Sequence, residues 1–155
     1  MMKKTGLILM LWVLGYAAKA QEVRWDTCKF MTYNVLNFDN TGNDKEQYLF
    51  EVVDSMHPDI LIVQELIELS GAIRFFDSVV YKVDTNYAMG TFINSFDTDN
   101  GIYFRKDKFA FITNTPITTE LRDINEFQLK HIASGEEIYF YSLHLKASSG
   151  GTNAD

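Results

Sequence analysis

The stretch PDILIVQE, residues 58–65, decides how this sequence folds. Its centre, ILIV at 60–63, is a continuous apolar run that is too short for a buried helix. A run of this kind is typical of a strand covered on both faces, as in a sheet packed against helices. Glu65 follows the run directly, so the stretch predicts a buried strand that ends on a carboxylate.

The residues before this strand predict a strand, a loop and a helix. KFMTYNV (29–35) is rich in β-branched and aromatic residues, which favours a strand, and we expect Cys28 to be buried in a strand. The polar loop 39–44 turns at Gly42 and leads into a helix that ends at Pro58. Asp44 and Gln47 predict a capping box at the start of that helix. Residues at helical spacing predict its apolar face: Tyr48, Leu49, Val52, Val53 and Met56.

The residues after 65 predict a second helix over 72–80, capped by Ser70, and then a series of strands. The expected strands are 91–94, 101–104, 109–113, 127–132 and 137–145, with Gly135 at the turn of a terminal hairpin. The order β-α-β-α followed by strands predicts an α/β (α+β) fold, a mixed β-sheet with helices on one face.

Composition agrees with one folded domain. The 155 residues are 46% hydrophobic and 23% charged, which excludes disordered and collagen-like chains. Cys28 is the single cysteine, so no disulfide can form within the chain.

Residues 1–20 are typical of a secretory signal peptide. Lys3 and Lys4 precede an apolar run over 7–18, and Ala18-Lys19-Ala20 is a cleavage pattern. We therefore expect a secreted or periplasmic protein with no transmembrane anchor after cleavage; an uncleaved N-terminal anchor is the alternative. The cleaved chain would hold 11 basic and 21 acidic residues, a formal charge of −10. That charge argues against broad binding to nucleic-acid phosphates.

Three polar residues lie where strands are predicted to end: Asn34, Glu65 and His144. Strand ends gather at one edge of an open α/β sheet, where ligands bind. Carboxylate and amide oxygens suit Mg²⁺ or Ca²⁺, and a histidine can contact phosphate or move a proton. Each residue also has a purely structural interpretation: Asn34 could cap a turn, Glu65 could begin the next helix, and His144 could be an ordinary core or edge histidine.

Four strings resemble, in order and spacing, successive motifs of the endonuclease/exonuclease/phosphatase superfamily, the DNase I-like metal-dependent phosphodiesterases and phosphatases. They are MTYNVLNF (31–38), PDILIVQE (58–65), GIYFRKDKF (101–109) and YSLHLKA (141–147). The resemblance implies about half of a four-layer α/β sandwich, here a partial domain over 21–155 that is truncated at its C-terminus.

The resemblance also implies roles for individual residues. Glu65 would bind a divalent metal ion, Mg²⁺ or else Ca²⁺ or Mn²⁺, with Asn34 supporting the metal and phosphate site. His144 would contact the scissile phosphate and assist proton transfer. Arg122 would hold substrate, or else be a solvated arginine beside Asp123. Asp99 would orient His144, or else lie in an exposed loop.

The sequence departs from the family after residue 147. It has no GDFN-like string and no Asp-His pair, which in the family orient and activate the nucleophile, and SSGGTNAD (148–155) stands where the family continues. We therefore expect a secreted metal-dependent phosphoric-ester hydrolase, a nuclease or phosphatase, that is inactive as this chain. The substrate would be a nucleic acid, a lipid headgroup or a small phosphate ester.

The alternative is a secreted non-catalytic binding or structural module built on part of the same fold. Relatives pack two sheets face to face, so half a domain would leave one apolar sheet face without a partner. Such a face predicts self-association.

Overall fold

The computed structural model describes residues 26–42, 44–95, 97–120 and 122–145. The expected signal peptide (1–20) and the segment 148–155 lie outside the described residues. The elements, in chain order, are β1 (Phe30–Phe38), α1 (Lys45–Met56), β2 (Ile60–Leu66), α2 (Glu68–Phe75), the π-helical turn η1 (Phe76–Val80), α3 (Tyr81–Val83), β3 (Tyr87–Met89), β4 (Asp99–Arg105), β5 (Phe109–Ile117), β6 (Ile124–His131) and β7 (Glu137–Ser142).

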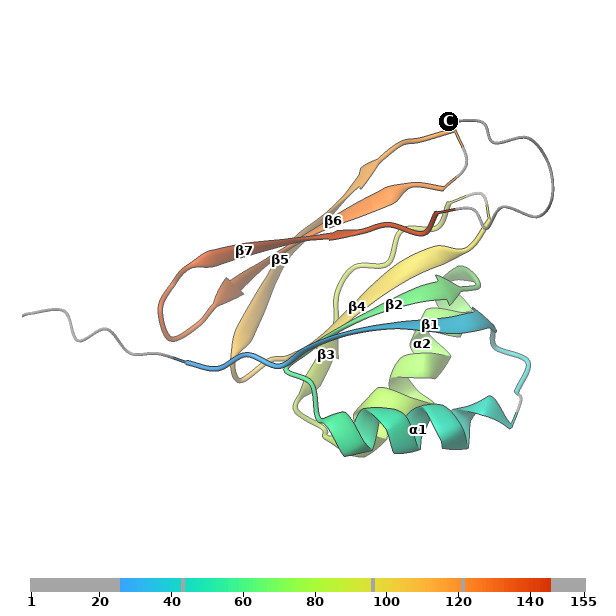
Figure 1. Ribbon diagram of the computed structural model, residues 1–155, viewed down its shortest axis with the longest axis horizontal. Helices are drawn as coiled ribbons and strands as arrows, with labels where there is room; N and C mark the ends of the chain where they lie inside the picture. Colours follow the sequence, from blue (N-terminus) through green and yellow to red (C-terminus); the bar gives the residue numbers. More distant parts are fainter. Residues whose placement is uncertain (1–25, 43, 96, 121, 146–155) are drawn as a thin grey trace, which may run out of the picture.

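Two sheets form the centre of the molecule (Figure 1). The first has the order β1-β2-β4-β3, in which β1 and β2 are parallel and β4 runs antiparallel to both β2 and β3. The second is the antiparallel sheet β5-β6-β7. The predicted α+β class with a mixed sheet is confirmed.

The helices cover one face of the first sheet, and the second sheet covers the other (Figure 1). β2 contributes to both interfaces because successive side chains of a strand point to opposite faces. Its Leu61 and Val63 pack among helical side chains, whereas Ile60 and Ile62 pack against Phe127 and its neighbours in the second sheet. The prediction that 60–63 is buried on both faces is confirmed.

This layering corrects one expectation. The helix-free face of the first sheet does not lack a partner, because β5 and β6 place Phe109, Phe127 and Leu129 against it. The outer face of the second sheet does carry exposed apolar side chains. On β7, exposed Tyr139 and Tyr141 alternate with the inward-packed Ile138 and Phe140.

The helix α1 ends where it is predicted to end, just before Pro58, but it begins differently from its prediction. Asp44 is the N-cap residue but makes no side-chain cap hydrogen bond, and Gln47 donates to Glu51 instead, so the capping-box prediction is wrong. The helix ends at His57, whose backbone is left-handed and whose N–H donates to the carbonyl of Val53 at 2.9 Å. Leu49 and Val53 are buried as predicted, whereas Tyr48 and Met56 are exposed.

Further along the chain, several boundaries differ from the prediction. The second helical segment begins at Glu68 rather than after Ser70 and contains a π-helical turn. The strand predicted at 91–94 is absent, and a three-residue strand, β3, precedes it. The hairpin turn is confirmed, because Gly135 has a φ of 77° between β6 and β7. Cys28 is exposed and lies before β1 rather than in a buried strand. No helix of the described residues is long and apolar enough to cross a membrane.

Candidate metal and phosphate site

The ends of β1 and β2 bring Asn34 and Glu65 together. The two parallel strands pair in register up to Asn34 and Gln64, and the pairing then shifts before it resumes at Phe38 and Leu66. β1 thus carries extra residues opposite β2, which is the geometry of a β-bulge. Asn34 lies inside β1 rather than at its end, because the strand continues past the bulge to Phe38.

The bulge is a region of left-handed backbone. Leu36, Asn37, Glu65 and Glu68 have φ values of 54°, 52°, 63° and 56°. Residues other than glycine adopt this region at a steric cost, and such residues concentrate at functional sites. At the left-handed Glu65, the side chains of β2 cease to alternate between the two faces of the sheet. The Glu65 carboxylate therefore contacts the side chain of Asn34 on the neighbouring strand β1.

The Glu65 carboxylate accepts hydrogen bonds from three directions. Its Oε1 atom lies 2.9 Å from Asn34 Nδ2 and 3.1 Å from His144 Nε2, and its Oε2 atom accepts the backbone N–H of Asn37 at 3.1 Å. Asn34 is fixed in turn, because its Oδ1 atom accepts the N–H of Leu36 at 2.9 Å. The Glu65 side chain is 15% exposed, so the carboxylate is held in place yet still reachable from solvent.

His144, two residues beyond β7, lies between Glu65 and Arg122. Arg122 Nη1 is 3.0 Å from both ring nitrogens, and Thr98 Oγ1 is 3.4 Å from Nδ1. A guanidinium can only donate, so one ring nitrogen must accept from it. With Nε2 donating to Glu65, the remaining Nδ1 is the acceptor, which corresponds to the neutral Nε2–H tautomer of His144.

Arg122 is anchored by an acidic residue, so it is not simply a solvated arginine beside Asp123. Its Nε and Nη2 atoms lie 2.8 Å and 2.6 Å from Asp97 Oδ2, so the partner is Asp97 and not Asp123. The structure therefore brings together all four residues singled out in the sequence. We call this group the Glu65 cluster: Asn34, Glu65, Arg122 and His144.

Asp99 does not join the cluster. Both expectations for it are wrong, because it is neither in an exposed loop nor in a described contact with His144; it begins β4 and is 4% exposed. Its Oδ1 accepts the N–H of Ser95 at 2.8 Å, and its Oδ2 has no partner among the described residues. Burial raises the pKa of Asp99 to about 6, against the lowering effect of the Ser95 N–H, with smaller raising contributions from Asp123 and Asp97.

A set of buried or half-buried polar residues next to the cluster was missed from the sequence: Gln64, Asn100, Asn114, Asn125 and Ser142. The last four are at most 8% exposed. Side-chain hydrogen bonds join Asn100, Asn125 and Asn114 into one group and Gln64 and Ser142 into another. Asn114 also donates to a backbone carbonyl. The signal was present in the alternation of the strands. Asn100 stands two residues before Ile102 and Asn125 two residues before Phe127, so each occupies an inward position of its strand.

The donor chemistry of the Glu65 cluster fits a hard divalent cation. Mg²⁺ in proteins is commonly held by one or two carboxylates together with waters and substrate phosphates. Glu65 supplies a carboxylate with lone pairs to spare, and Asn34 Oδ1 keeps a second lone pair beside it. Within the described ranges, no group of three or more His, Cys, Asp or Glu side chains is arranged to hold a metal ion. Any protein contribution to a cation here would thus rest on Glu65 and Asn34.

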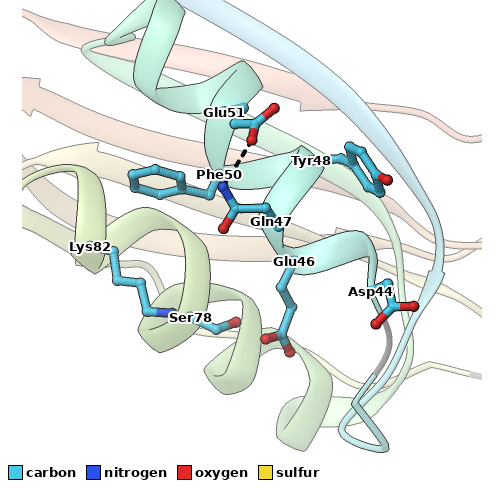
Figure 2. Close-up of a pocket in the computed structure, with 8 residues that line it drawn as sticks. All are labelled: Asp44, Glu46, Gln47, Tyr48, Phe50, Glu51, Ser78 and Lys82. Atoms are coloured by element: carbon cyan, nitrogen blue, oxygen red, sulfur yellow. Dashed lines mark hydrogen bonds between the residues drawn. The ribbon is translucent and has the colours of Figure 1, made fainter.

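A groove of about 720 Å³ lies elsewhere, along α1 (Figure 2). Figure 2 shows acidic side chains of α1, Glu46 and Glu51, on the same groove as Lys82 of α3. Glu46 is engaged by Arg74 in an ion pair, and Glu51 accepts from Gln47. No residue of the Glu65 cluster lines this groove, so it is separate from the candidate site.

Comparisons with known proteins identify the fold. No family model matches the sequence, and no curated protein matches it. Among solved structures, D. rerio TDP2 complexed with a single-strand DNA product is 22% identical, with a TM-score of 0.60 over 79% of this chain and 48% of that one. The human Nocturnin catalytic domain with bound sulfate is 19% identical, with a TM-score of 0.59 over 79% and 51%.

A third structure, ANGEL2, a 2',3'-cyclic phosphatase in complex with adenosine-2',3'-vanadate, is 15% identical, with a TM-score of 0.56 over 77% and 41%. The chain spans about half the length of the solved structures that it matches.

Proposed function

We propose that the chain, whose fold is similar to that of DNase I-like endonuclease/exonuclease/phosphatase structures, carries the metal- and phosphate-binding part of a secreted, metal-dependent phosphoric-ester hydrolase. The observation that carries the proposal is the convergence on one carboxylate. Glu65 is held by Asn34 and His144, with Arg122 beside the histidine, and these residues come from four separate segments of the chain.

Each residue of the cluster has a definite task in this proposal. Glu65 and Asn34 hold the divalent cation, which when bound stabilises negative charge on phosphoryl oxygens. Arg122 presents a guanidinium, the group best suited to bind phosphate oxygens in pairs. His144 contacts the phosphate and holds or moves a proton at Nε2, the nitrogen that donates to Glu65.

The chain binds Mg²⁺ weakly and does not turn over phosphate esters. The printed sequence contains no GDFN-like string and no Asp-His pair, so it offers no matched residues to orient and activate a nucleophile. Positioning and electrostatic stabilisation without an activated nucleophile give binding rather than catalysis.

The substrate class is a phosphate ester: a nucleic acid, a lipid headgroup or a small phosphate ester. The solved structures of similar fold were obtained with a single-strand DNA product and with adenosine-2',3'-vanadate, which supports a phosphate group as the recognised element. The charge of −10 expected after cleavage disfavours nonspecific attraction to nucleic acid.

The secreted location rests on residues 1–20. Export of the full chain in a bacterial host yields a mature protein that begins at Gln21, as measured by intact mass and N-terminal sequencing. A mature protein that still begins at Met1 contradicts the secretion part of the proposal.

The exposed face of the second sheet provides a surface for self-association. Ile112, Ile117, Tyr139 and Tyr141 are each at least 43% exposed on β5 and β7. We expect concentration-dependent self-association through this face. Sedimentation velocity across a range of concentrations tests it, and a monomer at every concentration contradicts it.

Metal binding tests the central proposal. Mn²⁺ is the probe, observed by paramagnetic broadening and by competition with Mg²⁺. Wild type binds Mn²⁺, and Glu65→Gln weakens binding by at least about tenfold because the ligating carboxylate is lost. The matched control is Glu51→Gln, which removes an exposed carboxylate of α1 that also accepts an amide hydrogen bond.

Three outcomes contradict parts of the proposal. Equal Mn²⁺ affinity in wild type and Glu65→Gln shows that Glu65 does not ligate the metal. A stable monomer with no Mn²⁺ binding supports the non-catalytic module instead. Hydrolysis of bis(p-nitrophenyl) phosphate that requires metal and disappears in Glu65→Ala contradicts the inactive state while it supports the hydrolase.

A further inference from the structure

The space between the two sheets changes from apolar to polar toward the Glu65 cluster. Phe109, Phe127 and Leu129 fill its apolar part together with Ile60 and Ile102. The polar part contains a continuous chain of hydrogen bonds, which we call the amide relay. It consists of the Thr91 carbonyl, the side chains of Asn114, Asn125 and Asn100, and the Ser142 carbonyl.

The relay runs head to tail. Asn114 Nδ2 donates to the Thr91 carbonyl at 2.9 Å, Asn125 Nδ2 donates to Asn114 Oδ1 at 3.0 Å, and Asn100 Nδ2 donates to Asn125 Oδ1 at 2.8 Å. Asn100 Nδ2 also reaches the Ser142 carbonyl at 3.5 Å. The bonds thus join β4, β5, β6 and β7 to the segment that follows β3.

Three of the four strands that the relay joins, β4, β6 and β7, have a residue of the cluster or a contact of it close by in the sequence. Asn100 follows Thr98, which contacts His144, by two residues, and Asn125 follows Arg122 by three. Ser142 precedes His144 by two residues. The relay therefore fixes the backbone just before or after these positions.

A second contact extends the same arrangement to β2. Gln64 Nε2 lies 3.3 Å from Ser142 Oγ and 2.9 Å from Thr32 Oγ1, and Gln64 immediately precedes Glu65. β2, which carries Glu65, is thereby tied to β7, which precedes His144 by two residues.

The relay is costly as a purely structural device. Asn100 is 3% exposed, and its Oδ1 has no hydrogen-bond partner in the part of the chain that the structure describes. An apolar side chain at this inward position would continue the packing of Ile102 and would avoid that unsatisfied oxygen. A directional amide, unlike an apolar side chain, sets the relative positions of the strands it joins.

We propose that the amide relay positions the Glu65 cluster, with Asn100 and Asn125 acting as positioning residues that hold His144 against Glu65 and Arg122 against His144. The expected effect of the relay on metal affinity rests on the proposed metal and phosphate site. Its expected effect on the contact between His144 and Glu65 does not, because that contact exists without a ligand.

The test compares Asn100→Leu with Ile102→Ala in the full chain. Both changes lie on inward positions of β4, but Ile102 packs in the apolar part and takes no part in the relay. Mn²⁺ affinity falls on the order of tenfold in Asn100→Leu, the range found when groups that support metal ligands are removed. It is unchanged in Ile102→Ala, even if that variant loses as much stability in urea. Equal affinities in the two variants at equal stability overturn the proposal.

A second readout is independent of the proposed function. In the metal-free chain, the nuclear Overhauser contact between the His144 ring and the Glu65 side chain is present in wild type and in Ile102→Ala, and is lost in Asn100→Leu. Its persistence in Asn100→Leu overturns the proposal. If wild type binds no Mn²⁺, the proposed function fails. The contact between His144 and Glu65 then still tests whether the amide relay positions the cluster.

A third variant covers the case in which Asn100→Leu does not fold. Asn114→Ala removes the far end of the relay, where Asn114 is 8% exposed and donates to the Thr91 carbonyl. It weakens the His144–Glu65 contact in the same direction as Asn100→Leu. An unchanged contact in a folded Asn114→Ala chain overturns the proposal.

Discussion

His144 Nε2 lies 3.1 Å from Glu65 Oε1, although Glu65 belongs to the first sheet and His144 follows β7 of the second by two residues. The contact forms because β2 and β7 end at the same edge of the stacked sheets, and because the left-handed backbone at Glu65 breaks the strand's alternation. A strand in regular register would send the side chains of Gln64 and Glu65 to opposite faces. The bulge is thus the structural origin of the candidate site, and its strain can be measured.

The first prediction concerns that strain. Glu65→Gly is more stable to urea than Glu65→Ala by about 1 kcal/mol, because a Cβ in the left-handed region meets the backbone and glycine has none. Both variants lose the carboxylate, so the difference reports the backbone alone. The same pair at Glu51, in the interior of α1, provides the control. There the order reverses, with alanine more stable by roughly 0.5–1 kcal/mol. Equal stabilities at position 65 would show that its backbone is not left-handed.

The second prediction concerns the ion pair between Arg122 and Asp97. The Asp97 side chain is 48% exposed, so a double-mutant cycle with Arg122→Ala and Asp97→Ala gives a coupling free energy of less than about 1 kcal/mol. Inorganic phosphate binding to the Mn²⁺-loaded chain is lost in Arg122→Ala.

Arg122→Lys does not restore that binding. A single ammonium cannot contact both Asp97 and His144 as the planar guanidinium does. Urea unfolding and phosphate titration measure the two effects. A stability loss of several kcal/mol, or full recovery of phosphate binding with lysine, contradicts this assignment.

The sequence predicts the fold best where the apolar pattern of a segment matches the secondary structure that the segment adopts. The ILIV run predicted a strand covered on both faces, since apolar residues at every position need two apolar neighbours. It could not reveal that one cover is a second sheet of the same chain, because pattern says only that a face is apolar. Pattern also failed at the short β3, whose three residues leave too little periodicity to detect.

The sequence predicts which residues form the candidate site, but not the ion pair and hydrogen bonds that hold them in place. Asn34, Glu65, Arg122 and His144 were named from motifs, and the structure brings them together. The partner of Arg122 was missed, because Asp97 and Asp123 are equally plausible from sequence and the fold of the segment decides between them. The amide relay was missed because a polar residue in a strand is usually assigned to the exposed face.

The third prediction concerns the buried carboxyl of Asp99. Its pKa of about 6 lies above the value near 4 that an unfolded chain gives, so the folded chain binds this proton more tightly. The contribution of Asp99 to stability is fully present below about pH 4 and is lost as the pH rises through 6. Asp99→Asn is therefore more stable than wild type at pH 7–8, by up to roughly 3 kcal/mol.

Urea unfolding between pH 4 and 8 measures this difference. Asp77→Asn, an exposed carboxyl of η1, serves as the control and follows wild type across the range. Parallel curves for wild type and Asp99→Asn contradict the raised pKa.

The fourth prediction tests the packing of the two sheets. Phe127 is fully buried between them, and Phe127→Ala lowers the free energy of unfolding by about 3–5 kcal/mol because the lost ring leaves a cavity. Tyr141 lies on the opposite face of the second sheet, and Tyr141→Ala costs about 1 kcal/mol or less. If the two substitutions cost the same, the second sheet does not cover the first.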